Sequence, residues 1–332
     1  MEFPNDADES EQRKLKELLT KALPIPPDAG IIIYPNQMGG QSPDKHKLLQ
    51  SQTKHVVYKA LQDFPKGVHE VELYERVFDP NCDDEVLCEL RNFIPHYQGL
   101  FYEPETKVNY FCMTDALSHL KNPSICDIKM GLVSYSPDSS PEKIRTEESK
   151  YAWRRDLGFF ITAIRIFDGK SIHFDRNHCR SLNPTSVYDH GIRLFLGPDP
   201  RRARSLARLF CTRLKQMASW FEKQHHFAFY ASSLLFAYGN TDVSGLGPYD
   251  SPTTVDTDGA DKSGRNGTNN TTTESIVLYL IDFTRWCKLS SQRDDNLLYG
   301  LYKLIDLFER AAIDPTSPTW SIPSNSSVLT RE

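Results

Sequence analysis

The sequence predicts an α+β fold, because β-rich apolar runs and amphipathic helical segments are interspersed along the chain. The clearest helix is predicted over 204–224, where large apolar residues recur every three or four positions and Arg and Lys fill the other face. A length of 332 residues permits one large or two smaller domains with a real core. The strand candidates are 55–59, 108–113, 159–167, 227–238 and 275–283, and the other helix candidates are 69–78, 84–93 and 296–312.

The charge balance limits what the protein binds. The chain has 44 acidic against 39 basic residues and a formal net charge of −5, which argues against a protein that binds nucleic acid through a globally basic surface. A polyanionic ligand would need a locally basic site instead.

Seven scattered cysteines indicate reduced thiols, and no window approaches the ~18 apolar residues of a membrane span. The acidic start lacks a signal-peptide pattern, so we expect an intracellular protein.

Three segments are expected outside the folded domain. Residues 1–29 are predicted to form a polar N-terminal tail with a short helix, whose apolar face carries Leu15, Leu18 and Leu19. Residues 239–274 are rich in Gly, Ser, Thr, Asn and Asp, which predicts a disordered insertion between two hairpin strands. Residues 313–332 are predicted to be a Pro- and Ser-containing C-terminal tail. Because the insertion lies within a hairpin, it is no domain boundary.

The pattern P-x-x-x-D-x-K-x-G, at residues 123–131, carries the chemistry. Asp127 and Lys129 are two positions apart, so on an extended segment both side chains point to one face. A carboxylate and an ammonium presented together can orient a hydroxyl and neutralise a phosphoryl group leaving ATP. A surface ion pair at a strand end would have the same spacing, so the spacing alone leaves both interpretations open.

This pattern resembles the signature of the inositol polyphosphate kinase family. Three further landmarks follow in the family's order: the S-S-L-L segment within 231–236, the I-D-F at 281–283, and the closing helix at 294–304. Leu298 and Tyr299 depart from the usual pattern of that helix. The resemblance spans about 30–310. Within the family, the segments 86–99 and 134–144 look most like the inositol polyphosphate multikinases.

The resemblance implies a two-lobed, protein-kinase-like fold with ATP bound between the lobes. We therefore expect one catalytic domain over 30–312, with an N-lobe of about 30–115 and a C-lobe of about 116–312. For the ATP site it implies that Lys59 holds the ATP phosphates, with Glu70 as the carboxylate partner of this lysine. It implies that Asp115 binds the ATP ribose, although Thr114-Asp115-Ala116 departs from the family's E-D-V.

The remaining roles also follow from the resemblance. Asp127 and Lys129 are the expected catalytic pair, and Asp282 is the expected Mg²⁺ ligand and ATP-site residue, with Ser233 beside it at the metal site. Arg285 stands where the multikinases commonly have His, so a guanidinium would grip phosphate there without titrating near neutral pH. The expected substrate-binding residues are Lys129, Lys143, Lys150, Arg165 and Arg285, whereas Arg154 and Arg155 are interpreted as a solvated helix face.

The expected activity is an ATP- and Mg²⁺-dependent phosphotransferase acting on hydroxyls of inositol tris- and tetrakisphosphates. Two alternatives remain: a hexakisphosphate kinase that makes pyrophosphates, and a non-catalytic phosphate-binding scaffold or transcription-complex subunit. We expect a monomer that binds no nucleic acid directly and works in nucleus and cytoplasm, and inositol lipids stay open as substrates.

Overall fold

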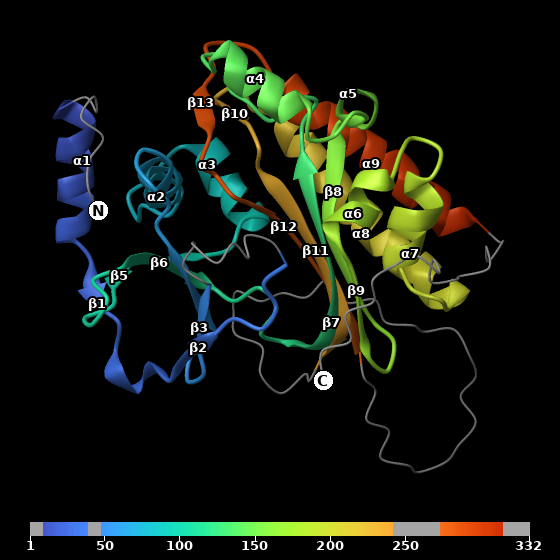
Figure 1. Ribbon diagram of the computed structural model, residues 1–332, viewed down its shortest axis with the longest axis horizontal. Helices are drawn as coiled ribbons and strands as arrows, with labels where there is room; N and C mark the ends of the chain where they lie inside the picture. Colours follow the sequence, from blue (N-terminus) through green and yellow to red (C-terminus); the bar gives the residue numbers. More distant parts are fainter. Residues whose placement is uncertain (1–8, 39–47, 242–272, 315–332) are drawn as a thin grey trace.

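The computed structural model describes residues 9–38, 48–241 and 273–314 and arranges them in two lobes, each built on a sheet (Figure 1). The N-lobe sheet has the strand order β1-β5-β6-β4-β3-β2. Its elements are α1 (Glu9–Thr20), β1 (Leu23–Pro24), β2 (Ile31–Ile33), β3 (Leu49–Ser51), β4 (Val56–Ala60), α2 (Lys66–Val77), α3 (Glu85–Leu90), β5 (Tyr97–Tyr102) and β6 (Asn109–Thr114). The mixed α+β class expected from the sequence is confirmed.

The C-lobe sheet is antiparallel, with the strand order β12-β11-β7-β8-β9. Helices α8 and α9 pack against each other on the face of this sheet that is turned away from the N-lobe (Figure 1). The elements are β7 (Leu120–Met130), α4 (Pro141–Glu148), α5 (Arg154–Leu157), β8 (Phe159–Phe167), β9 (Ser171–Phe174), α6 (Arg176–Ser181), α7 (Arg193–Phe195), α8 (Pro200–Lys223), β10 (Phe227–Phe229), β11 (Ser233–Thr241), β12 (Thr273–Ile281), β13 (Trp286–Lys288) and α9 (Asp295–Ile313).

Helix α1 belongs to the N-lobe and is not a free tail. Leu15 and Leu18 are buried in the main hydrophobic core, and Lys14 forms an ion pair with Glu72 of α2 at 3.3 Å. Strand β1 then pairs in parallel with β5. The helix predicted within residues 1–29 is therefore present, but its apolar face covers α2, because four buried or half-buried leucine and alanine positions are costly to leave in water.

One strand predicted from the sequence is two strands in the structure. The apolar run 227–238 divides into β10 and β11 because Ala231 adopts a left-handed backbone with φ of 60°, which interrupts strand pairing. Strand β10 pairs with β13 instead of joining the large sheet. Strands β11 and β12 extend to Thr241 and from Thr273, into the segment 239–274 predicted as disordered. The rest of that insertion, and residues 315–332 of the predicted C-terminal tail, lie outside the described residues.

Helix α9 supports the end of β7. The Asn296 side chain accepts a hydrogen bond from Val133 N at 2.9 Å, and Gly131 N donates to Gly158 O at 2.9 Å. Gly300 packs directly beneath that turn: a Cβ atom there would lie 2.2 Å from Gly158 O, so no larger residue fits. The glycine of the closing-helix motif is thus explained by the close approach of two backbones.

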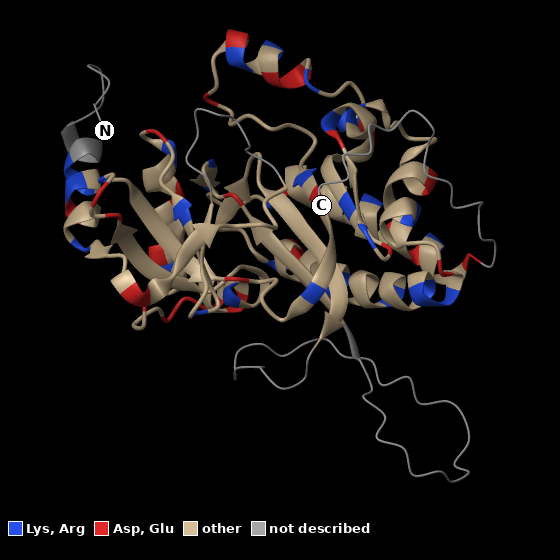
Figure 2. Cartoon of the chain, turned by 60° about the horizontal axis from the view of Figure 1, so that its bottom comes forward, with Lys and Arg blue, Asp and Glu red and all other residues tan. Residues whose placement is uncertain are grey.

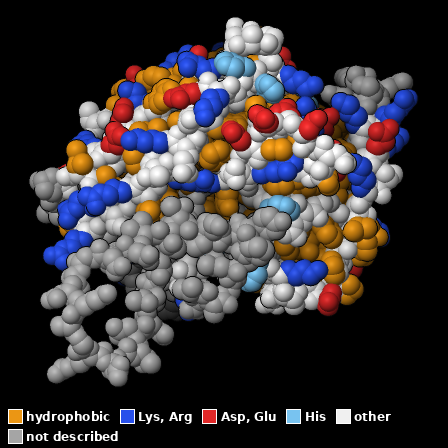
Figure 3. All heavy atoms as spheres, turned by 180° about the vertical axis from the view of Figure 1, so that it is seen from behind, with side chains coloured by type: hydrophobic (Ala, Val, Ile, Leu, Met, Phe, Trp, Pro, Cys, Tyr) orange, Lys and Arg blue, Asp and Glu red, His pale blue; other side chains and the backbone are white. Residues whose placement is uncertain are grey.

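Charged residues of both signs are interspersed over the described surface. Basic and acidic side chains alternate along both lobes (Figure 2) and over the face seen from behind (Figure 3). No described helix combines the length and apolar character needed to cross a bilayer. Any strong attraction for an anion must therefore come from a local cluster.

Candidate active site

Strand register brings the catalytic-pair residues to one end of the C-lobe sheet. Lys129 pairs with Ser233 of β11, and Ser233 pairs with Ile281 of β12, so Asp282 follows at the same end. Alternation along β7 buries Cys126, Ile128 and Met130 in the core beneath the sheet. Asp127 and Lys129 consequently lie on the opposite face, toward the N-lobe.

Asp127 is a carboxylate held in a mostly buried position. Burial and the nearby Asp282 carboxylate together raise its pKa to about 6, against the effect of hydrogen bonds from Ser233 and Thr162, which favour the charged form. Its Oδ1 atom is buried and has no hydrogen-bond partner within the described residues. An orphaned acceptor of this kind is costly unless a ligand supplies a donor. The geometry suits a carboxylate that accepts a hydrogen bond from the hydroxyl group of a ligand.

Lys59 joins the two lobes through two carboxylates. Its Nζ lies 2.7 Å from Glu70 Oε1 on α2 and also contacts Asp282 of the C-lobe. Glu70 Oε1 further accepts a hydrogen bond from Phe283 N at 3.2 Å. Burial acts to lower the pKa of Lys59, but the two carboxylates outweigh it and hold the pKa above its usual value. Residues far apart in the sequence thus form one ion-pair network between the lobes.

The donor set at this network fits a divalent cation such as Mg²⁺. The Asp282 side chain is 38% exposed. Its partial burial acts to raise its pKa, but Lys59 and Lys129 hold the pKa below the usual range, so Asp282 is an available anionic oxygen ligand. Within the described part of the chain, no three His, Cys, Asp or Glu side chains are grouped closely enough to hold a metal alone. Mg²⁺ typically binds through one or two carboxylates plus substrate phosphates. The hydroxyl of Ser233, predicted at the metal site, instead hydrogen-bonds Asp127.

Asp115 lies just after β6, at the connection between the lobes, and is buried. Its Oδ1 accepts hydrogen bonds from Tyr34 Oη at 2.7 Å and Leu117 N at 2.9 Å, and its Oδ2 accepts one from Gln50 Nε2 at 3.0 Å. The carboxylate predicted to bind ribose is therefore engaged by protein donors in this structure. Sequence reasoning did not identify Tyr34 or Gln50 as its partners.

Arg165 is separated from the other predicted substrate-binding cations. It is buried opposite Ile125 and donates to Asn36 Oδ1 at 2.6 Å and to Pro123 O at 3.4 Å. Its guanidinium thus links β8 to the loop that follows β2. The structure gives Arg165 a clear bridging contact between the lobes, whereas its predicted contact with substrate stays a prediction.

Glu147 is the carboxylate around which the remaining predicted substrate cations gather. Its Oε1 lies 2.9 Å from Lys143 Nζ, 2.8 Å from Lys150 Nζ and 4.0 Å from Arg285 Nη1. Burial acts to raise its pKa, but the two lysines lower it to about 2. The side chain is 6% exposed. Sequence reasoning missed this hub, although Lys143 and Lys150 stand four and three positions away, the spacing that brings helical side chains together.

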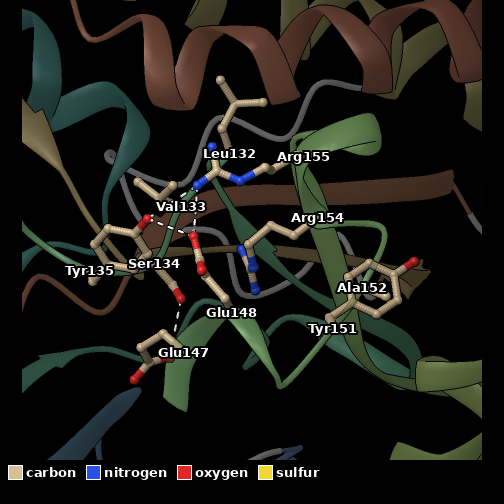
Figure 4. A pocket seen from close by; sticks show the side chains of 10 residues that line it. All are labelled: Leu132, Val133, Ser134, Tyr135, Glu147, Glu148, Tyr151, Ala152, Arg154 and Arg155. Carbon is tan, nitrogen blue, oxygen red and sulfur yellow. Dashed lines mark hydrogen bonds and ion pairs between the residues drawn. The ribbon is translucent and has the colours of Figure 1, made fainter. Parts of the chain in front are cut away.

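Arg154 is the clearest correction to the sequence interpretation. It is 6% exposed, not solvated, and its Nη1 donates to Gly131 O at 3.1 Å. Arg155, by contrast, lies on the exposed face and pairs with Glu148 at 2.7 Å. The side chain of Arg154 lies between Glu148 and Tyr151 in a pocket of about 190 Å³ (Figure 4). Residues 132–135, the end of α4 and the start of α5 form the pocket wall.

Comparison with known proteins shows which family this chain is similar to. The family model described as inositol polyphosphate kinase matches residues 110–309. An inositol polyphosphate multikinase of Homo sapiens is 32% identical over 214 residues, covering 63% of this chain and 51% of the relative. The multikinase alpha of Arabidopsis thaliana is 27% identical over 206 residues, covering 56% of this chain and 70% of the relative. The chain thus spans about half the length of the human relative.

A solved structure shows the same fold. It is an inositol phosphate multikinase from S. cerevisiae in complex with ADP and Mn²⁺, with a TM-score of 0.56, 22% identity, and coverage of 77% of this chain and 98% of that one. At this identity the likeness establishes the two-lobed fold alone. Because the family model spans more than half of the residues and the fold agrees, the chain belongs to the inositol polyphosphate kinase family.

Proposed function

We propose that the protein is an ATP- and Mg²⁺-dependent kinase that transfers the γ-phosphoryl group to hydroxyls of inositol tris- and tetrakisphosphates. The observation that carries the proposal is the placement of Asp127 beside Asp282, which Lys59 and Glu70 link to the N-lobe. The curated relatives named as multikinases support the substrate class.

In this proposal Asp127 orients the acceptor hydroxyl. The unpartnered Oδ1 accepts the hydrogen bond of the hydroxyl. The proton moves to this oxygen as the bond between the hydroxyl oxygen and the γ-phosphorus forms and the bond from that phosphorus to the leaving ADP breaks. A pKa of about 6 keeps the carboxylate ionised at neutral pH while leaving it basic enough to take a proton. Ser233 keeps the carboxylate in place through its hydroxyl.

Two lysines offset the charge on the phosphates. Lys59 is held by Glu70 and Asp282 where the donor phosphates would lie between the lobes. Lys129 follows Asp127 on the same face and neutralises the phosphoryl group in transfer. Asp282 is the residue that would hold Mg²⁺, and the bound ion supplies additional neutralisation of the donor phosphates.

The test is a product profile. Purified protein with ATP and Mg²⁺ is offered inositol 1,4,5-trisphosphate, a tetrakisphosphate and the hexakisphosphate, and the products are resolved by anion-exchange chromatography. We expect phosphorylation of the tris- and tetrakisphosphates, abolished in Asp127→Asn. Pyrophosphate formation from the hexakisphosphate would instead favour the alternative kinase activity. No turnover of any inositol phosphate by the folded protein would overturn the proposal.

A further inference from the structure

Arg154 is a buried cation. Among the described residues it forms no ion pair, and its only hydrogen bond within them is to the Gly131 carbonyl. Its Nε atom is buried and also lacks a hydrogen-bond partner in the described structure. Burial lowers the pKa of Arg154 to about 10, so the guanidinium remains charged at neutral pH. A buried, unpaired charge costs several kcal/mol unless an anion compensates it.

The other charged residues in the wall of the pocket already have partners. Glu147 is held by Lys143 and Lys150, and Glu148 is held by Arg155 and by Tyr135 Oη at 2.9 Å. In Figure 4 dashed lines join Glu147 to Ser134 and Glu148 to Arg155 and Tyr135, and none reaches the Arg154 guanidinium. The Glu147 carboxylate favours the charged form of Arg154 but forms no ion pair with it, so the described wall of the pocket supplies no direct anion partner.

Arg154 is also close to the proposed reaction centre. It donates to the carbonyl of Gly131, two residues beyond Lys129, and its positive charge acts to lower the pKa of Lys129. Two cations that repel each other both gain from an anion placed between them. A guanidinium can in addition donate two parallel hydrogen bonds to a phosphate, which a lysine cannot.

We propose that Arg154 binds a phosphate group of the acceptor, other than the one being transferred, and so makes this pocket a phosphate subsite. The inference rests on the proposed function, because it places the inositol polyphosphate beside Lys129. It adds a specificity-determining cation to those expected from the sequence. It also explains why a charged residue is buried at a position where an apolar side chain would avoid the free-energy cost of removing a charge from water.

The test compares Arg154→Gln and Arg154→Met with the control Arg208→Gln, which removes an exposed guanidinium of α8 outside the pocket. Binding of inositol 1,4,5-trisphosphate is measured by calorimetry without ATP, and KM and kcat are measured with ATP and Mg²⁺. Losing a charge-assisted phosphate contact should weaken binding and raise KM by about tenfold or more, with kcat within about twofold. The control should change binding by less than about twofold.

A structural role makes a different prediction. If Arg154 only holds Gly131 in place, the variants lower the melting temperature with and without ligand equally, and binding by the folded protein is unchanged; this result overturns the inference. A phosphate contact instead reduces the ligand-induced rise in melting temperature. If wild-type protein binds the trisphosphate but does not phosphorylate it, the proposed function fails, whereas weaker binding by the Arg154 variants still supports the subsite. Absence of any binding by the wild type overturns both.

Discussion

The two sides of the proposed active site carry opposite charge imbalances. On the donor side, one ammonium, that of Lys59, faces two carboxylates, those of Glu70 and Asp282. On the acceptor side, the relation is reversed, because the single buried carboxylate of Glu147 faces Lys143, Lys150 and Arg285, with the unpaired Arg154 beside them. The first side therefore suits an added cation, and the second suits a ligand with several negative charges.

The largest expected effect comes from the residue between the two sides. Replacing Asp127 by Asn keeps the shape and the Ser233 contact but removes the basic oxygen, so kcat should fall by about 10³-fold, roughly 4 kcal/mol of transition-state stabilisation. The readout is kcat with inositol 1,4,5-trisphosphate, with Asp156→Asn on the exposed face of α5 as the control. Near-normal turnover by Asp127→Asn would show that neither side depends on this carboxylate.

The acceptor side also depends on packing beneath it. Gly300→Ala would push a Cβ atom against Gly158 O and disturb the turn after β7, so the free energy of unfolding should fall by about 3 kcal/mol. Urea unfolding measures this loss. Gly169→Ala is a control without a steric clash, because no atom lies within 4 Å of an added Cβ there. Its φ of 70° adds backbone strain that Gly300 does not have, at a cost of about 1 kcal/mol. Equal losses in both variants would contradict the close-packing explanation.

The donor side can be changed without the acceptor side. Glu70→Gln removes one of the two carboxylates on Lys59, so the KM for ATP should rise by about tenfold while the KM for the inositol phosphate stays unchanged. Glu72→Gln is the control on the same helix, where the glutamate pairs with the exposed Lys14. A parallel rise in both KM values would mean that the two sides are not separable.

An element of the fold was predicted well when the residues that determine it lie within its own stretch of sequence. The bounds of β8 agree with the apolar run 159–167, because this strand is buried along most of its length and flanked by polar residues. The division between β10 and β11 was not predicted, since it depends on the left-handed backbone of Ala231, an unusual conformation for alanine. Helix α4 was missed because it is mostly polar and only Glu147 is buried.

The site divides in the same way. The placement of Lys59, Glu70 and Asp282 at one ATP site was expected only through the family resemblance, and the direct contact of Lys59 with Asp282 was not predicted. Asp282 is 223 residues away from Lys59 along the chain, and no periodicity connects them. Arg154 and Arg155 are adjacent basic residues, of which the first is buried and the second is exposed. Arg154 donates to the carbonyl of Gly131, which lies 23 positions earlier, just after β7, and it makes a cation–π contact with Phe160 of β8. The spacing of residues along the sequence does not indicate that Gly131 lies beside Arg154.

The smallest expected change in ligand binding comes from the variant that tests Glu147 as an internal anion. In Glu147→Gln, Lys143, Lys150 and Arg285 lose their shared carboxylate, so stability at neutral pH should fall by about 2 kcal/mol, after allowing for the partial exposure of the lysines. Binding of inositol 1,4,5-trisphosphate should tighten by about fivefold, because the ligand no longer competes with a protein carboxylate for these cations. Opposite changes in stability and affinity distinguish this role from simple loss of structure.

The pKa of Glu147 determines in which direction its contribution to stability changes with pH. The pKa of Glu147 in the folded protein is lowered from 4.5 to about 2, so its stabilisation is complete above about pH 4.5 and is lost as the pH falls toward 2. Urea unfolding at about pH 7 and about pH 3.5 should therefore show a stability difference between wild type and Glu147→Gln that narrows in acid. Glu148→Gln, beside it on the exposed face of α4, should show a much smaller difference at both pH values. A gap between wild type and Glu147→Gln that stays constant with pH would place the stabilisation in packing, and the acceptor-side cations would then be held apart without an internal anion.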